Sequence, residues 1–296
     1  MLGDASERYP IIGETFSESS DVLGYDLWRL VSDGPEEHLT LTEYTQPAIL
    51  TASVALHRCW QAEQGAAPEF VAGHSLGEYS ALVVAEALQL RDAALLVQTR
   101  GRAMQSAVPT GAGAMAAVLG LSDTVIDEVC VTHCDDEAYV GAVNYNSPGQ
   151  VVIAGHAAAV DAASTVMKEA GAKRVIPLPV SAPFHTPLMQ PAAGVMAEAF
   201  QSVALNDAKI PVVSNVDAQP RRKAVEIRRL LVRQVSEPVM WTQCMRTLLQ
   251  AGCQNFIECG PGRVLTGLIK RIDKLVACTP IEKPDTLRGA ARGEKL

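Results

Sequence analysis

The sequence predicts an α/β protein in which a large domain with a parallel central sheet carries a small ferredoxin-like subdomain. The chain has 296 residues, 48% of them hydrophobic but only 5% aromatic, which suits small apolar side chains packed between helices and a parallel sheet. From Gly111 onward, the expected elements follow the order β-α-β-β-α-β, the split motif of ferredoxin-like domains. We therefore expect the large domain at residues 1–110 and 184–296, and the subdomain at residues 111–183.

The large domain is expected to begin with helical segments, including residues 12–23. A long helix should run through Gln61, with Thr45 as its N-cap and Pro47 in its first turn, where both residue types are well tolerated. The apolar run at residues 69–72 predicts a buried strand, and residues 79–88 predict a buried helix. Asp92 is expected to cap a further helix that runs to Met104.

Within the subdomain, we expect strands at residues 113–119, 139–145, 150–154 and 173–180, and helices at residues 122–134 and 157–169. A turn at residues 146–149 should join the two middle strands, and Gly171 should end the second helix. Beyond the subdomain, strands are expected at residues 211–214 and 254–258. A Gly-Pro-Gly turn at residues 260–262 then leads into a helix at residues 264–272.

Charge and cysteine usage exclude several classes of function. The formal net charge of −8 argues against nucleic-acid binding, and no apolar stretch is long enough to span a membrane. The N-terminal segment does not resemble a signal peptide, and seven scattered cysteines fit a reducing cytoplasm better than a disulfide framework. Cys130, His133 and Cys134 raise the question of a metal site. They have no second ligand cluster, so we expect a helix surface there and no metal.

A G-x-S-x-G element stands at residues 73–77, between the expected strand and the expected helix. This setting is typical of a serine held on a sharp strand-to-helix turn, where its hydroxyl is exposed beside backbone N–H groups. Such a serine can attack a carbonyl carbon, and the N–H groups can bind the resulting oxyanion. Ser75 is therefore a candidate nucleophile for acyl transfer. The alternative is an ordinary glycine-rich turn with a surface serine.

A nucleophilic serine needs a base, and His185 is the candidate among six histidines. It lies between Pro183 and Pro187, where the subdomain returns to the large domain, and a rigidly held histidine suits a base that faces a cleft. From its spacing alone, a structural histidine is an equally good interpretation. The other five lie next to the serine, in helices or in a turn: His38, His57, His74, His133 and His156.

Several motifs extend over nearly the whole chain and are together highly specific. They are GHSLGEYSAL at residues 73–82, Arg100-Gly101, GAMAA at 113–117, NYNSPGQVVIAG at 144–155, VSAPFH at 180–185 and GPGRVL at 260–265. In these motifs the chain resembles the malonyl-CoA:acyl carrier protein transacylases. The resemblance implies a hydrolase-like α/β domain that carries a ferredoxin-like subdomain. It also implies malonyl-CoA and acyl carrier protein as partners, a role in fatty acid biosynthesis, and no cofactor.

The resemblance also implies roles for single residues. Ser75 would form a malonyl ester, and His185 would move the protons, oriented by the backbone carbonyl of Gln234. Arg100 would bind the malonyl carboxylate through its planar guanidinium, although without the resemblance a surface helix arginine would be the better interpretation. The backbone N–H of Leu76 would bind the oxyanion. The remaining substrate-binding positions are Met115, Asn146 and Phe184, the last of which points to malonyl rather than methylmalonyl groups.

The sequence departs from this family at its N-terminus. Relatives begin with an apolar strand and a Gly-Gln-Gly loop, followed shortly by Gly-Met, whereas this chain begins with Met1-Leu2-Gly3-Asp4 and contains no Gly-Gln-Gly. In relatives the strand belongs to the central sheet, and the loop supplies a second backbone donor to the oxyanion. We therefore expect that the sequence starts at an internal methionine of a longer reading frame. The alternative is a short protein with impaired chemistry.

Two other functions remain open at this level. A serine hydrolase shares the G-x-S-x-G element, but hydrolases place their histidine late in the chain, and none follows His185 here. Many hydrolases also have a small residue where this chain has Glu78. A non-catalytic remnant that binds CoA or carrier protein is the third possibility. An acidic carrier would need a local basic surface, such as the basic stretch at residues 221–233 or the one at 270–274, unless these are merely solvated helix faces.

Overall fold

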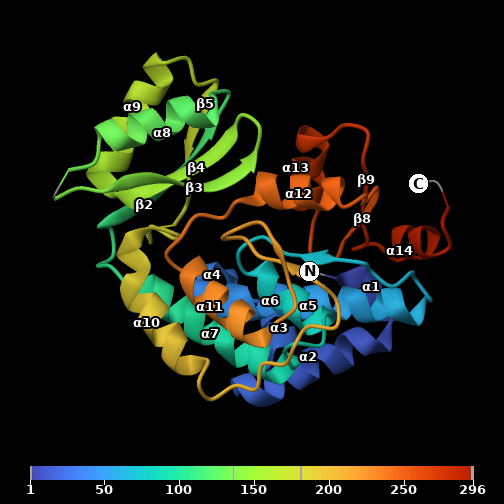
Figure 1. Ribbon diagram of the computed structural model, residues 1–296. Coiled ribbons are helices and arrows are strands. Elements are labelled where there is room, and N and C mark those ends of the chain that lie inside the picture. The colour runs from blue at the N-terminus through green and yellow to red at the C-terminus, as the bar shows by residue number, and fades with distance from the viewer. Residues whose placement is uncertain (1, 136, 181, 295–296) are drawn as a thin grey trace.

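The structure is a computed structural model that describes residues 2–135, 137–180 and 182–294, so Met1 and Ser181 lie outside the described residues (Figure 1). The helices are α1 Gly3–Arg8, α2 Pro10–Leu23, α3 Leu27–Asp33, α4 Glu36–Thr40, α5 Thr42–Ala62, α6 Gly77–Val84, α7 Leu90–Ser106, α8 Asp123–Thr132, α9 Ala157–Glu169, α10 Gln190–Ala199, α11 Ala224–Gln234, α12 Trp241–Gln250, α13 Val264–Ile272 and α14 Pro284–Ala291. The strands are β1 Val71–Ala72, β2 Gly113–Leu119, β3 Val140–Ser147, β4 Gln150–His156, β5 Arg174–Pro177, β6 Val212–Val213, β7 Pro220–Arg221, β8 Asn255–Glu258 and β9 Ala277–Pro280.

The ferredoxin-like arrangement is confirmed in the segment between β2 and β5. Its four strands form an antiparallel sheet in the order β3-β4-β2-β5, and α8 and α9 lie together on one face of it (Figure 1). Successive side chains of a strand point to opposite faces. Ala116 and Val118 accordingly join the core beneath the two helices, whereas Met115 packs with Val143 and Val152 on the other face. That second face is the one that contacts Phe184.

The other strands are short and pair in parallel where the sequence predicts a parallel sheet. β1 pairs with β6 in parallel, and β8 pairs with β9 in parallel, while β7 adds an antiparallel edge to β6. In a parallel pair the carboxyl ends of both strands lie at the same edge. The turn at residues 73–77 and the segment after Val213 therefore lie side by side, although they are far apart in the sequence.

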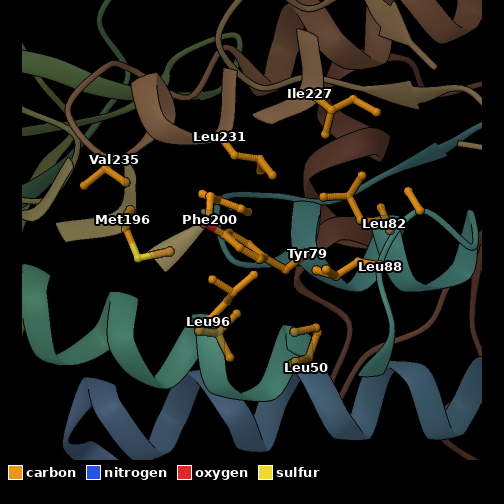
Figure 2. Packing of buried hydrophobic residues seen from close by; sticks show 14 of the residues in the cluster. Leu50, Tyr79, Leu82, Leu88, Leu96, Met196, Phe200, Ile227, Leu231 and Val235 are labelled. Atoms are coloured by element: carbon orange, nitrogen blue, oxygen red, sulfur yellow. The ribbon is translucent and has the colours of Figure 1, made fainter. Parts of the chain in front are cut away.

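Helices enclose the β1–β6 edge in a large apolar core. α5, α6, α7, α10 and α11 all contribute to it, and the rings of Tyr79 and Phe200 stack at its centre with centroids 6.3 Å apart (Figure 2). Burial of such side chains stabilises the fold by roughly 1.5–3 kcal/mol each. The start of α6, the middle of α7 and the end of α11 are thus held rigidly, and these parts of the helices carry candidate site residues.

Several predicted boundaries are wrong by a few residues. α5 begins at Thr42 with Leu41 at its N-cap, so Thr45 lies inside the helix, and its hydroxyl bonds the carbonyl of Leu41 at 3.0 Å. Asp92 does not cap α7, which begins at Leu90 after Gln89. The expected helix at 79–88 is instead Gly77–Val84, and the expected strand at 173–180 shortens to Arg174–Pro177. The expected helices at 157–169 and 264–272 and the strand at 113–119 are confirmed.

Candidate active site

The turn that carries Ser75 is strained and fixed by side chains from distant segments. Ser75 adopts a φ of 51°, which costs a non-glycine residue about 1–2 kcal/mol. Its N–H donates to Asn215 Oδ1 at 2.6 Å, and its carbonyl accepts from Gln234 Nε2 at 2.9 Å. Asn215 Nδ2 also donates to the carbonyl of Gly73 at 2.8 Å. A residue that follows β6 and the last residue of α11 therefore hold the turn in place.

Ser75 and His185 form a hydrogen-bonded pair. Ser75 Oγ lies 2.8 Å from His185 Nε2, and His185 Nδ1 lies 2.7 Å from the backbone oxygen of Gln234. Because a carbonyl only accepts, Nδ1 carries the proton, and Nε2 accepts from the serine hydroxyl. His185 is 4% exposed and has a φ of 62°. Burial, with the charge of Arg100 as a second cause, lowers the pKa of His185 to about 3, so its ring is neutral and able to take a proton.

Arg100 is buried because of its place on α7. Ala93, Leu96, Val97 and Met104 form the core-facing stripe of this helix, and position 100 continues their spacing. The guanidinium is only 2% exposed, and its centre lies 5.7 Å from the ring centre of Tyr79. The interpretation of Arg100 as a surface arginine is therefore wrong.

The contacts of Arg100 are polar but neutral. It donates to Gln46 Oε1 at 2.9 Å, to Gln234 Oε1 at 2.9 Å and to Ser75 Oγ at 3.1 Å. Its Nε has no partner, and it forms no ion pair with a carboxylate in the described part of the chain. Burial lowers the pKa of Arg100, yet an arginine side chain stays charged in proteins. The site thus holds a buried positive charge beside the serine hydroxyl.

One buried carboxylate belongs to the same network. Glu78 Oε2 accepts from Gln234 Nε2 at 2.8 Å and from the Asn215 N–H at 3.1 Å. Burial raises the pKa of Glu78 to about 7, and these two hydrogen bonds together with the charge of Arg100 oppose that shift. The carboxyl group does not contact the guanidinium directly. The amide of Gln234 lies between them.

The structure places the remaining expected site residues around this centre. Leu76 is the N-cap of α6, and its N–H donates to no group among the residues described. Met115 is 5% exposed in the apolar cluster of the small sheet, and Phe184 contacts both this cluster and the large core. Asn146 Oδ1 lies 2.7 Å from His74 Nε2, so His74 is engaged there rather than with the serine.

Four polar side chains of the site were not predicted from the sequence: those of Gln46, Glu78, Asn215 and Gln234. Asn215 had a usable signal, since a polar residue directly after a buried parallel strand lies at the edge where sites form. Two residues of the group that raised the question of a metal site form hydrogen bonds with backbone oxygens. His133 Nδ1 lies 2.8 Å from the Val129 oxygen, and Cys134 Sγ donates to the Val140 oxygen at 2.9 Å.

No helix within the described ranges is both long and apolar enough to cross a membrane.

The chain is similar to known proteins over nearly its whole length. Residues 15–278 match the family model described as the acyl transferase domain. The malonyl CoA-acyl carrier protein transacylase of Escherichia coli K12 is 49% identical over 290 residues, which cover 98% of this chain and 94% of the relative. The crystal structure of a malonyl-CoA:acyl carrier protein transacylase from Xanthomonas oryzae pv. oryzae is 49% identical and covers 100% of this chain and 94% of its own, with a TM-score of 0.97.

A further solved structure contains a carrier protein. It shows a malonyl-transacylase in complex with a type II PKS acyl-carrier protein, is 47% identical to this chain, and has a TM-score of 0.97 over 99% of this chain and 95% of its own. Sequence identity at this level over almost the full length shows membership of the same family, and not only a shared fold. The chain therefore belongs to the malonyl-CoA:acyl carrier protein transacylases, within the acyl transferase domain family.

Proposed function

We propose that this protein transfers the malonyl group from malonyl-CoA to the phosphopantetheine thiol of acyl carrier protein, for fatty acid biosynthesis. One observation carries the proposal. A guanidinium that is 2% exposed and that forms no ion pair with a described residue lies 3.1 Å from the hydroxyl of Ser75. An isolated buried charge is costly, so the site favours an acyl group that brings its own carboxylate.

In the first half-reaction, Ser75 Oγ attacks the thioester carbon while His185 Nε2 takes the hydroxyl proton. The Leu76 N–H donates to the oxyanion of the tetrahedral intermediate. The carbon–sulfur bond then breaks, His185 returns the proton to the CoA thiol, and the malonyl group remains on Ser75 as an ester. The carbonyl of Gln234 stabilises the protonated ring by accepting from Nδ1.

The second half-reaction runs through the same two residues. His185 takes the proton of the phosphopantetheine thiol, and the thiolate attacks the ester carbon. The bond to Ser75 Oγ breaks, and the proton returns to the serine. In every step, each bond formed at the acyl carbon replaces one that breaks, and each proton passes between Ser75, His185 and a thiol. The scheme therefore needs neither a metal nor a cofactor. A carrier protein as acceptor is supported by the related transacylase that was solved with an acyl-carrier protein.

Acyl specificity divides between a polar and an apolar side of the site. Arg100 binds the malonyl carboxylate with its charged fork, which an acetyl group cannot use. Phe184 and Met115 supply the apolar side from one shared cluster, and Asn146 acts through His74. Residues 111–183 form the subdomain in this proposal, which is supported by an apolar cluster drawn only from residues 114–175.

Location and docking complete the proposal. We place the reaction in the cytoplasm, which is supported by seven free cysteines, all in the described part of the chain.

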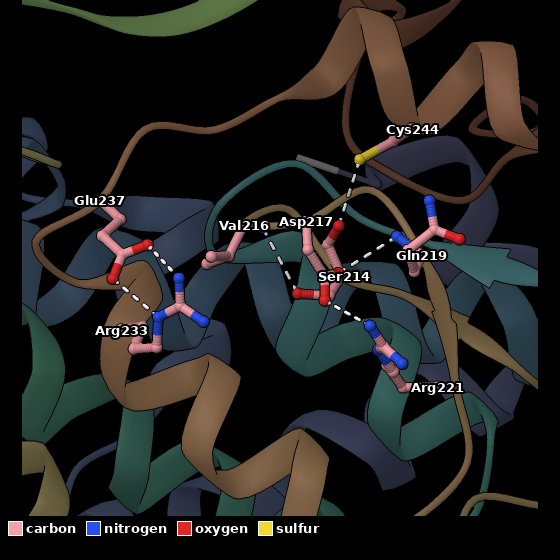
Figure 3. A network of polar contacts seen from close by, with 8 residues as sticks. All are labelled: Ser214, Val216, Asp217, Gln219, Arg221, Arg233, Glu237 and Cys244. Atoms are coloured by element: carbon pink, nitrogen blue, oxygen red, sulfur yellow. Dashed lines mark hydrogen bonds and ion pairs between the residues drawn. The ribbon is translucent and has the colours of Figure 1, made fainter.

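For docking of a carrier protein, fewer cations of the basic stretch at residues 221–233 are available than the sequence indicates. Arg221 pairs with Asp217 and Arg233 with Glu237 (Figure 3), and Lys223 also has a carboxylate partner. The exposed cations Arg228 and Arg229 of α11 remain for an acidic carrier, since neither forms an ion pair with a described residue.

Mass spectrometry of the protein mixed with malonyl-CoA tests the proposal. We expect a malonyl adduct on Ser75, absent in Ser75→Ala, that disappears when carrier protein with its phosphopantetheine arm is added and reappears on the carrier. Rapid release of free malonate without carrier would instead identify a hydrolase. A folded protein that forms no adduct and no malonate would contradict catalysis and leave a binding remnant.

A further inference from the structure

The carboxamide of Gln234 has a fixed orientation in the site. Its Oε1 accepts from Arg100 at 2.9 Å, while its Nε2 donates to the Ser75 carbonyl at 2.9 Å and to Glu78 Oε2 at 2.8 Å. The side chain is fully buried. A reversed amide would place its oxygen against two acceptors and its NH₂ group against a cation, losing all three bonds.

Of the two acceptors that Nε2 contacts, Glu78 is the stronger determinant of that orientation. The Ser75 carbonyl already accepts from the Glu78 backbone N–H at 3.1 Å, whereas the carboxylate is a charged acceptor, for which hydrogen bonds are about twice as strong. Above the Glu78 pKa of about 7, the amide dipole of Gln234 thus lies between an anion and a cation, with each end matched to its neighbour. In the dry interior this alignment strengthens both hydrogen bonds.

Glu78 is itself held so that it cannot turn away. It is 2% exposed near the N-terminus of α6, and the same Oε2 that binds Gln234 also accepts from the Asn215 backbone N–H. No described lysine or arginine forms an ion pair with it. The carboxylate therefore does not contact Arg100 directly: it influences the guanidinium through the Gln234 hydrogen bonds and through its charge.

We propose that Glu78 is a positioning residue for acyl selectivity: it orients the Gln234 carboxamide so that Oε1 holds the Arg100 guanidinium beside Ser75, ready for the malonyl carboxylate. This inference rests on the proposed function, because it assumes that Arg100 binds that carboxylate. The competing explanation is that Glu78 only stabilises the turn. Loss of a merely structural group impairs acylation by all acyl groups alike, whereas loss of a group that acts through Arg100 impairs malonyl transfer selectively.

The test measures competition between malonyl-CoA and acetyl-CoA, present together, for Ser75. The ratio of malonyl to acetyl adducts in the mass spectrum reports the ratio of the two kcat/KM values, and the fraction of folded protein cancels in it. Glu78→Met keeps an unbranched side chain but removes the acceptor, and we expect it to lower the ratio about tenfold. Glu78→Gln keeps an acceptor oxygen without the charge and is the matched control. We expect its ratio to stay within about threefold of the wild-type value.

Two further variants keep the inference testable. Glu78→Asp keeps the charge but withdraws the carboxylate by about 1.5 Å, and it should lower the ratio in the same direction even if the methionine variant does not fold. In an Arg100→Ala background, Glu78→Met should cause no further fall in the ratio.

The outcomes separate the two proposals. Equal losses of malonyl and acetyl adducts in the methionine and aspartate variants would overturn the inference, and so would a glutamine variant as unselective as the methionine variant. A wild-type protein that does not prefer malonyl-CoA would overturn the proposed function instead.

Discussion

The two glycines of the G-x-S-x-G element should respond very differently to substitution by alanine. A Cβ atom on Gly73 would lie 1.9 Å from the Gly77 carbonyl carbon and oxygen, and 2.5 Å from the Glu78 nitrogen. Non-bonded carbon atoms need about 3.5 Å, so the backbone would have to move by about 1.6 Å. At Gly77 an added Cβ meets no atom within 4 Å. Only the first glycine is therefore required by the packing of the turn.

The expected magnitudes follow from these contacts. Gly73→Ala should destabilise the protein by about 4 kcal/mol or more, because the atoms it meets are backbone and belong to a turn fixed from several sides. Gly77→Ala stands at the start of α6 and should change stability by less than about 1 kcal/mol, in the stabilising direction. Urea denaturation of both variants measures the difference. Equal stabilities for the two variants would refute the steric reasoning.

Three other predictions follow from the site and its surface. Asn215→Ala leaves two backbone groups of the serine turn without partners, so it should lower the free energy of unfolding by about 2–6 kcal/mol, and a loss under about 1 kcal/mol would count against the network. Burial lowers the pKa of His185 from 6.5 to about 3, so its ring resonances in NMR should show no titration between pH 8 and pH 5. The contribution of the neutral ring to the free energy of unfolding is full above pH 6.5 and falls as the pH drops toward 3. A midpoint near 6.5 would contradict the assigned burial. Charge reversal of Arg228 and Arg229 should raise the KM for carrier protein about threefold or more without changing the KM for malonyl-CoA, and equal changes in both would exclude docking on α11.

The features that could be predicted from the sequence are those with local causes. The strand–turn–helix setting of Ser75 and the βαββαβ order follow from short-range patterns, and both are confirmed. The burial of Arg100 was also within reach, because its spacing from Leu96 and Val97 places it on the apolar stripe of α7. The residue pattern alone nevertheless favoured a surface arginine, because charged residues usually prefer solvent, and only the family resemblance gave Arg100 a place in the site.

The features that could not be predicted depend on pairing between distant segments. Asn215 meets the serine turn only because β1 and β6 pair in parallel, across about 140 residues of chain, and no pattern in the sequence fixes that pairing. The error at Thr45 has a local cause instead. A threonine two residues before a proline is a good cap by its residue type, but Leu41 occupies the N-cap and α5 begins at Thr42, so the threonine lies inside the helix.

Gln234 links three functions at the end of one helix. Its backbone oxygen accepts a hydrogen bond from the His185 ring, its amide nitrogen donates to the Ser75 carbonyl, and its amide oxygen accepts from Arg100. A small rotation of α11 would therefore disturb His185, Ser75 and Arg100 together. Met115 and Phe184 belong to an apolar cluster outside that network, so changes to them leave these hydrogen bonds in place. Engineering of the acyl range should begin with those two side chains.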